Sequence, residues 1–151
     1  MLESGLRCGE ILSLEAGFFD PHHRRLTVRG ARARDRTVPL DDGLVDLLQR
    51  WLDRRPDSRW LFPTSNGRQL NGRYVRDMVK RYAKKAGIVE VDRVSPRILR
   101  HTYAADLYVY SRDVALLQRR LGHNYRSSTV SYMKMLTPME RRGCDPDFES
   151  Q

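Results

Sequence analysis

The chain has 151 residues, with 28 lysines and arginines against 19 aspartates and glutamates, and a formal net charge of +9. No apolar run approaches the ~20 residues of a membrane-spanning helix, and Cys8 and Cys144 have neither metal-ligand spacing nor the density of a disulfide framework. We therefore expect no membrane span, no bound metal and a reducing, cytoplasmic compartment. Only four of the basic residues are lysines, and arginine is suited to bidentate phosphate contacts. Nucleic acid is a candidate partner, although an arginine-rich genome would explain the same charge.

The predicted elements follow an α+β order, mostly helical, with one small antiparallel sheet. Residues 8–16 are predicted to be helical, and residues 25–29 and 36–40 to be two strands around a basic, glycine-containing turn. Asp41 or Asp42 is predicted to cap a helix with apolar residues at helical spacing up to Leu52. Further helices are expected from Asn71 to Gly87, from Ser95 to about Tyr108, over 113–121 with a stop at Gly122, and over 128–135.

The helix that follows Asn71 has two contrasting faces. Its apolar face is predicted to hold Val75, Met78, Val79, Tyr82, Ala83 and Ala86. Its other face carries Arg73, Arg76, Lys80, Arg81, Lys84 and Lys85. A run of charge is usually a solvated face, but six bases against one acid, Asp77, favours contact with a DNA backbone.

The stretch SPRILRHTY, residues 95–103, opens a helix in an unusual way. Ser95 is predicted to be the N-cap and Pro96 the first helical residue. Arg97, Arg100 and His101 then oppose the helix dipole, whose N-terminal end is already positive. An anion from outside the chain would resolve this conflict.

Three motifs occur in order along the chain: GLRCGE (residues 5–10), SPRILRHTY and LGHNYRSSTVSY (residues 121–132). His123 of the L-G-H motif comes 23 residues after Arg100, and Tyr132 comes nine residues after His123. Taken singly, Arg7 could be a surface arginine, His123 a helix C-cap and Tyr132 a packing residue. Taken together, from Gly5 to about Tyr132, they resemble the tyrosine recombinase, or phage integrase, family.

The resemblance implies a tyrosine-recombinase-like catalytic domain that cleaves and rejoins DNA strands through a 3′-phosphotyrosyl intermediate, as a recombinase or integrase of a mobile element. It implies that Tyr132 is the nucleophile, that Arg7 and Arg100 hold the non-bridging phosphate oxygens, and that His123 hydrogen-bonds the scissile phosphate. Because covalent catalysis conserves the bond energy, no cofactor is expected. The spacing from L-G-H to Tyr132 favours a recombinase over a type IB topoisomerase, which shares the chemistry.

Two positions depart from the family pattern. The hairpin lysine that delivers a proton to the leaving 5′-oxygen is replaced by Ala31, aligned on V-P-L. Arg29, Arg32 or Arg34 can supply charge there, but arginine does not give up a proton near neutral pH. Arg97 occupies a catalytic position that is commonly histidine or lysine, and it is a poor proton shuttle. The alternative is a catalytically impaired DNA-binding relative that acts as a regulator or decoy.

We expect residues 1–136 to form the catalytic domain, residues 137–151 to be a partly flexible tail, and the family's N-terminal core-binding domain to be absent. The expected partner is double-stranded DNA, with self-association on the DNA favoured by apolar surface near Leu2, Leu6 and Ile11. The predicted DNA-binding residues are Arg29, Arg32, Arg34, Arg73, Arg76, Lys80, Arg81, Lys84 and Lys85.

Overall fold

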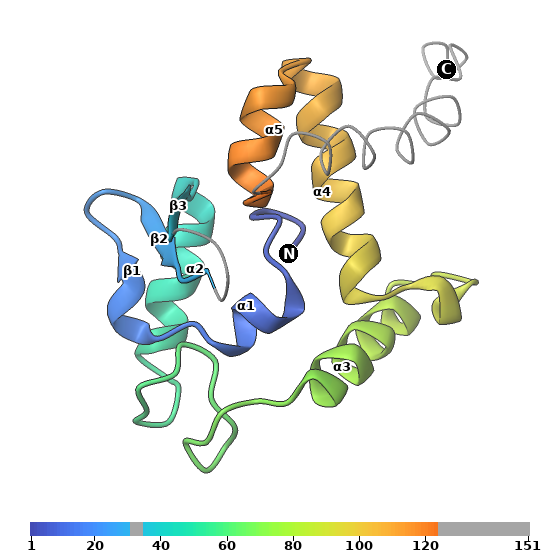
Figure 1. Cartoon of the computed structure of the whole chain (residues 1–151). Coiled ribbons are helices and arrows are strands. Elements are labelled where there is room, and N and C mark those ends of the chain that lie inside the picture. The colour runs from blue at the N-terminus through green and yellow to red at the C-terminus, as the bar shows by residue number, and fades with distance from the viewer. Residues whose placement is uncertain (31–34, 124–151) are drawn as a thin grey trace, which may run out of the picture.

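The computed structural model describes residues 1–30 and 35–123. Over these residues the α+β prediction is confirmed: the chain is mostly helical and has a three-stranded antiparallel sheet (Figure 1). The helices are α1 (Cys8–Leu12), α2 (Asp42–Leu52), α3 (Gly72–Lys85), α4 (Pro96–Ser111) and α5 (Val114–Leu121), with two short 3-10 turns, η1 (Ala16–Phe18) and η2 (Val91–Arg93). The strands are β1 (Phe19–Asp20), β2 (Arg25–Val28) and β3 (Arg36–Pro39).

The sheet is a meander with β2 in the centre. Leu26 pairs with Val38 and Val28 pairs with Arg36 across the β2–β3 hairpin. Since side chains alternate along a strand, Leu26, Val28 and Val38 share the inner face, and each is at most 3% exposed. The two longer strands agree with the prediction, whereas β1 was not predicted, because a strand of two residues has no periodicity.

The first helix is shorter than predicted. The reading of residues 8–16 as helix is wrong after Leu12, where α1 ends. The backbone N–H of Leu61 donates to the carbonyl of Leu14, and Glu15 forms an isolated bridge with Trp60. Pairing with this distant segment competes with the helix, and Leu14 is buried as a result.

The helix caps agree with the sequence. Asp41, Asn71 and Ser95 each accept a hydrogen bond from a backbone N–H in the first turn of α2, α3 and α4, respectively.

The prediction of Tyr82 on the apolar face of α3 is wrong, because this side chain is 59% exposed. Arg81 and Lys85 lie over its ring, 5.9 and 5.7 Å from the centroid, so the tyrosine belongs to the basic face.

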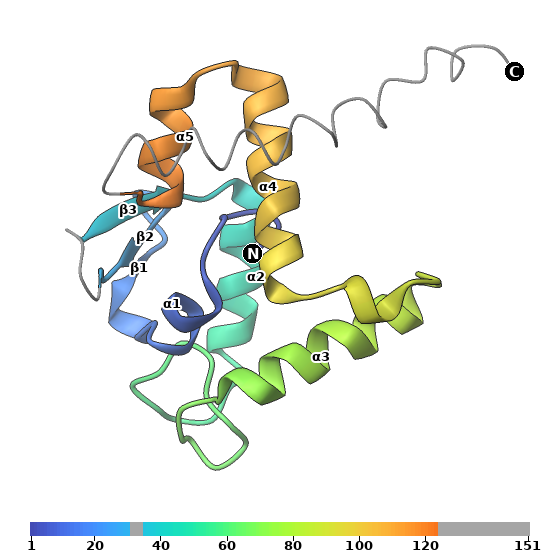
Figure 2. The ribbon, with the colours of Figure 1, turned by 45° about the vertical axis from the view of Figure 1, so that its right-hand side comes forward.

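Two clusters of buried apolar side chains flank α1. One joins the sheet to α2, and the other joins α4 to α5. Figure 1 shows α1 between the sheet with α2 on one side and the helices α3 and α4 on the other, with α5 above it, and Figure 2 shows α4 and α5 side by side. The expected apolar surface is only partly present: Leu2 is 46% exposed, whereas Leu6 is buried in the first cluster. Within the described residues, no helix is long and apolar enough to cross a membrane.

Candidate active site

The candidate site begins at the start of α1, the helix between the two cores. Arg7 is the N-cap, and its backbone N–H donates to Oε2 of Glu10 at 2.7 Å. The Arg7 guanidinium donates to Oε1 of the same carboxylate at 3.1 Å. The Arg7 side chain is 47% exposed and the Glu10 side chain only 11%, so the arginine reaches solvent while the carboxylate does not.

Glu10 is shared by three arginines. Arg36 on β3 pairs with both of its oxygens, at 2.7 and 2.9 Å, and Arg100 on α4 approaches Oε2 at 3.7 Å. Burial alone would raise the pKa of Glu10, but the hydrogen bonds from Arg36 and Arg7 outweigh burial and lower it. The carboxylate is therefore ionised at neutral pH, and it brings together guanidinium groups from three segments of the chain.

Arg100 is 6% exposed. Its Nη1 donates to the carbonyl of Gly5 and its Nη2 to the carbonyl of Leu121, both at 2.7 Å. A buried cation is tolerated only when it is paired and hydrogen-bonded, and here two carbonyls and Glu10 meet that requirement. Arg100 thus joins the turn before α1 to the end of α5 and fixes the position of its own guanidinium.

His123 follows the end of α5. Gly122 takes the left-handed conformation, with φ of 61°, and stops the helix as predicted. The His123 ring lies with its Nε2 3.4 Å from Nη2 of Arg100. Since a guanidinium only donates, Nε2 is the acceptor, and the neutral ring carries its proton on Nδ1.

The surroundings of His123 disfavour its charged form. Burial and the positive charges of Arg100, Arg7 and Arg36 lower its pKa from 6.5 to about 4, against a small opposing effect of Glu10. His123 is therefore expected to be neutral at pH 7. An anion bound beside it would raise this pKa again.

We expect the free energy of unfolding to fall as the pH is lowered from 6.5 towards 4. The unfolded chain binds a proton at His123 more readily than the folded chain does, so protonation in this window favours unfolding. Urea unfolding at pH 7 and pH 5 measures the effect, with His123→Gln as the control variant. A loss of stability that is the same in wild type and variant would contradict the assignment.

The other predicted site residues lie as follows. Arg97, one turn before Arg100 on α4, is exposed, and its Nε donates to Nε2 of His101 at 3.1 Å. His101 is buried, and its pKa is lowered by burial and by these two arginines. The structure thus connects Arg97 to His101, while Arg7, Arg100 and His123 meet around Glu10. Tyr132, Ala31, Arg32 and Arg34 lie outside the described residues.

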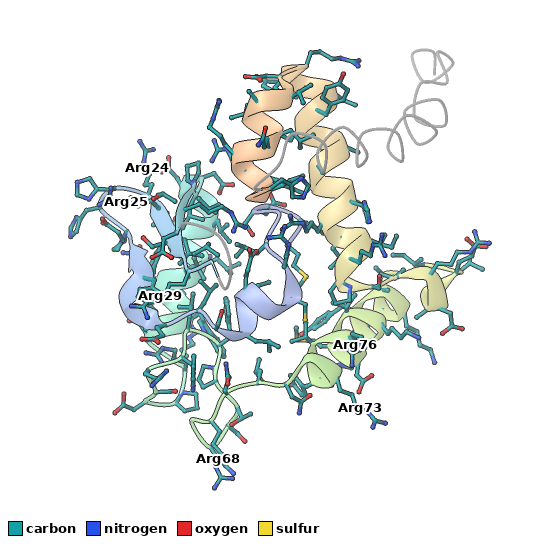
Figure 3. The ribbon with its side chains drawn as sticks, viewed as in Figure 1. Arg24, Arg25, Arg29, Arg68, Arg73 and Arg76 are labelled. Carbon is teal, nitrogen blue, oxygen red and sulfur yellow. The ribbon has the colours of Figure 1, made fainter. Side chains whose placement is uncertain are left out.

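The described members of the predicted DNA-binding set are all exposed: Arg29, Arg73, Arg76, Lys80, Arg81, Lys84 and Lys85. Figure 3 shows Arg29 on the sheet side of α1, and Arg73 and Arg76 on the other side, on α3. Lys80 forms an ion pair with Asp92 at 2.9 Å. Basic side chains therefore stand on both sides of the helix that begins at Arg7.

The sequence patterns do not indicate the part played by Glu10 and Arg36. Glu10 occurs there only as the last residue of the motif GLRCGE, and Arg36 only as the first residue of a predicted strand. The sequence does contain a pattern that could have indicated a buried Arg36: residues 36, 38 and 40 alternate along a strand and therefore share one face. Val38 and Leu40 are buried on that face, so an arginine at 36 needs an internal partner.

The cluster defines a class of site. One carboxylate faces three guanidinium groups and a neutral histidine, which leaves an excess of positive charge around a half-exposed arginine. Such an arrangement has the chemistry that an oxyanion site requires: fixed guanidinium donors with an excess of positive charge. The fold and the site therefore define a basic protein with a candidate oxyanion site beside a small sheet and a group of helices.

The comparisons with known proteins give the family. The family model described as "Phage integrase family" matches residues 1–137. This chain belongs to that family, as the order of its three motifs indicated.

Curated relatives include the tyrosine recombinase XerD of Brucella suis, 35% identical over 141 residues, and the tyrosine recombinase XerC of Alcanivorax borkumensis, 34% identical over 134 residues. These alignments cover 88% and 85% of this chain, and 45% and 43% of the relatives. The chain thus spans about half the length of the curated relatives it matches.

Two solved structures share the fold. The XerA recombinase superimposes with a TM-score of 0.80 at 27% identity, over 95% of this chain and 55% of that one. The XerH recombinase, solved bound to its difH substrate after cleavage, gives a TM-score of 0.77 at 23% identity, over 94% of this chain and 42% of that one.

Proposed function

We propose that this chain is the catalytic domain of a site-specific DNA recombinase that cleaves and rejoins DNA strands through a 3′-phosphotyrosyl intermediate. The observation that carries the proposal is the convergence of Arg7, Arg100 and His123 around Glu10. Family membership and the position of Tyr132 in the third motif support it. The proposed domain is residues 1–136; the predicted helix over 128–135 and the predicted tail over 137–151 lie outside the described residues.

The proposed reaction is a transfer at phosphorus. The Tyr132 hydroxyl oxygen attacks the phosphodiester, the new tyrosyl–phosphorus bond replaces the bond to the 5′-oxygen, and that oxygen leaves as a hydroxyl. The tyrosine loses its proton and the leaving oxygen gains one, so the balance is neutral. Rejoining is the reverse reaction with a 5′-hydroxyl of the partner strand.

Arg7 and Arg100 stabilise the negative charge that grows on the two non-bridging oxygens. Their positions are set before DNA arrives, since Glu10 and the carbonyls of Gly5 and Leu121 already hold them. Preorganised donors of this kind are the main source of stabilisation in oxyanion sites. His123 donates a hydrogen bond to the phosphate through its Nδ1–H group, since its Nε2 accepts from Arg100.

The experiment that tests the proposal uses a nicked suicide substrate, which releases a short 5′-hydroxyl fragment so that the covalent intermediate cannot be religated. A stable protein–DNA adduct is expected, in which the protein is linked to the 3′-phosphate at the broken end of the strand. Tight DNA binding without any adduct would instead support the alternative, a DNA-binding regulator or decoy, which the replacement of the family's lysine by Ala31 favours.

Ala31→Lys is expected to raise the rate of adduct formation. A lysine at this position can deliver the proton that the leaving 5′-oxygen needs. The neighbouring arginines cannot deliver it, because arginine does not give up a proton near neutral pH. The control is a substrate whose 5′-oxygen is replaced by sulfur, a leaving group that needs no proton: wild type and variant should cleave it equally fast. If the lysine gives no gain on the oxygen substrate, another group already supplies the proton.

Binding of double-stranded DNA is proposed to use the exposed basic residues on both sides of α1. Each neutralised phosphate releases counterions, so log K should fall with log salt by about 0.9 per phosphate. The double variant Arg73→Gln, Arg81→Gln should lose two phosphate contacts, so its slope should be smaller by about twice the value for one phosphate. The control is Arg54→Gln, which changes an exposed arginine outside the set and should leave the slope unchanged. The measurement is a salt titration with two unrelated duplexes. An unchanged slope in the double variant would exclude this face of α3.

Self-association on DNA is also proposed, supported by the exposure of Leu2. Sedimentation of the chain with and without a duplex carrying two sites tests it. A single chain on that duplex at every concentration would contradict it.

A further inference from the structure

Arg36 lies beside the candidate site, and its whole guanidinium group is hydrogen-bonded within the protein. Its side chain is 13% exposed, and each of its three nitrogens donates: Nη1 and Nη2 to Glu10, and Nε to the carbonyl of Arg120 at 3.2 Å. A bidentate contact combined with a third bond in the same plane fixes both the position and the tilt of the guanidinium. The side chain therefore connects β3 to α1 and to the last turn of α5.

Both ends of this connection lead to residues that are proposed to hold the phosphate. At one end, Glu10 also contacts Arg7 and Arg100. At the other end, the carbonyl of Arg120 lies in the last turn of α5, and His123 follows this turn. Figure 2 shows the end of α5 beside β3.

Gly122 reports how closely α5 approaches this guanidinium. A Cβ atom at Gly122 would lie 2.8 Å from Nη1 and 2.9 Å from Cζ of Arg36, distances that real Cβ atoms do not show. The backbone that directs His123 towards Arg100 thus rests against the Arg36 side chain. If Arg36 moved, the backbone at Gly122 would lose the side chain it packs against, and His123 could shift with it.

Stability alone does not account for the choice of arginine here. Position 36 lies on the inner face of the sheet beside Val28, where an apolar side chain would pack without desolvating a charge. The pair between Arg25 and Asp20 in the same sheet has side chains 50% and 31% exposed, as surface pairs usually do. The ion pair between Arg36 and Glu10 is buried, unlike the pair between Arg25 and Asp20, and its carboxylate belongs to the candidate site.

We propose that Arg36 is a positioning residue for strand cleavage, which sets Glu10 and the end of α5 so that Arg7, Arg100 and His123 address one phosphate. This inference rests on the proposed function. It also links the β2–β3 hairpin, whose strand carries Arg36, to the geometry of cleavage.

The first test is the single-turnover rate of adduct formation. Arg36→Lys keeps the charge but cannot make the bidentate pair and the carbonyl bond together, and we expect a loss of at least about tenfold. Arg36→Gln should lose more. DNA affinity should stay within about twofold for Arg36→Lys, since this charge faces Glu10 and not the solvent. The control Arg25→Gln, which removes the surface pair of the same sheet, should cleave at the wild-type rate.

The second test distinguishes positioning from a general structural role. If Arg36 acts through Glu10, Arg36→Gln should cost little in a chain that already carries Glu10→Gln, so the two losses should not multiply. The NMR titration of His123 gives a readout without DNA: Arg36→Gln should raise the pKa of His123, because one of the cations that lower it is gone. Circular dichroism establishes that the variants remain folded.

The outcomes separate the two proposals. A wild-type chain that forms no adduct overturns the proposed function and this inference with it. A wild-type chain that forms adduct, while both Arg36 variants match its rate, overturns only the inference. Losses that multiply in the double variant would show that Arg36 does not act through Glu10, and unfolding of both Arg36 variants would assign this residue to stability; either result would also overturn the inference.

Discussion

Tyr132→Phe is expected to abolish the covalent protein–DNA adduct while DNA binding stays near the wild-type level. The substitution removes one hydroxyl oxygen, which is the atom proposed to bond to phosphorus, and leaves the ring in place. The loss should be complete within detection, because a phenylalanine has no group that can attack. The assay is denaturing electrophoresis of the chain with a labelled nicked duplex.

Tyr110→Phe is the matched control for this prediction. Tyr110, near the end of α4, is 93% exposed, so it tests whether any accessible tyrosine can react. This variant should form adduct at the wild-type rate. Adduct that persists in Tyr132→Phe would show that another residue is the nucleophile.

Arg7→Ala is expected to slow adduct formation by about 10²–10³-fold, the cost of one preorganised donor in an oxyanion site. Arg7 is half exposed, and Glu10 keeps Arg36 as its partner when Arg7 is removed, so the variant should remain folded. Single-turnover rates measured beside Arg25→Ala, an exposed arginine with its own carboxylate partner, isolate the effect of position. A rate near wild type would contradict the proposed clamp.

Arg100 is expected to show a comparable kinetic loss with an added cost in stability. Arg100→Ala would leave the carbonyls of Gly5 and Leu121 without their donor, and buried polar groups without a partner are costly. Arg100→Lys keeps a cation and is the better probe of the chemistry. The contrast between Arg7 and Arg100 follows from burial, since both contact the same carboxylate.

The cluster around Glu10 also explains why basic residues occur in the first turns of α4, where they oppose the helix dipole. Arg100 opposes the helix dipole, and the chain meets part of that cost internally with Glu10 and two carbonyls. One carboxylate does not balance three guanidinium groups. A phosphodiester can supply further negative charge, and the transition state of its cleavage supplies more.

The helix boundaries could be predicted because their signals are local. Asp41, Asn71 and Ser95 each accept a hydrogen bond from an N–H group three residues further along the chain, so the sequence alone contains the interaction. The end of α1 could not be predicted, because it depends on pairing between Leu14 and Leu61. That contact joins segments far apart in the chain.

The candidate site divides in the same way. The three motifs predicted that Arg7, Arg100 and His123 belong to one site, and these residues lie close together in the structure. What holds them is a contact between Glu10 and Arg36, 26 residues apart, on a helix and on a strand. Local spacing does not show such a pair, and only the alternation of β3, with an arginine on its inner face, hints at it. Tyr132 and Ala31 remain predictions from the motifs.

The most direct test of the account is to identify the amino acid that becomes linked to DNA. The wild-type adduct with a suicide substrate is digested with nuclease and trypsin, which cuts after Arg126 and Lys134 and releases residues 127–134, a peptide whose one tyrosine is Tyr132. We expect mass spectrometry to find a nucleotide 3′-phosphate on this tyrosine. A linkage to Tyr125 or to any other residue, or no adduct from a chain that binds the duplex, would contradict it.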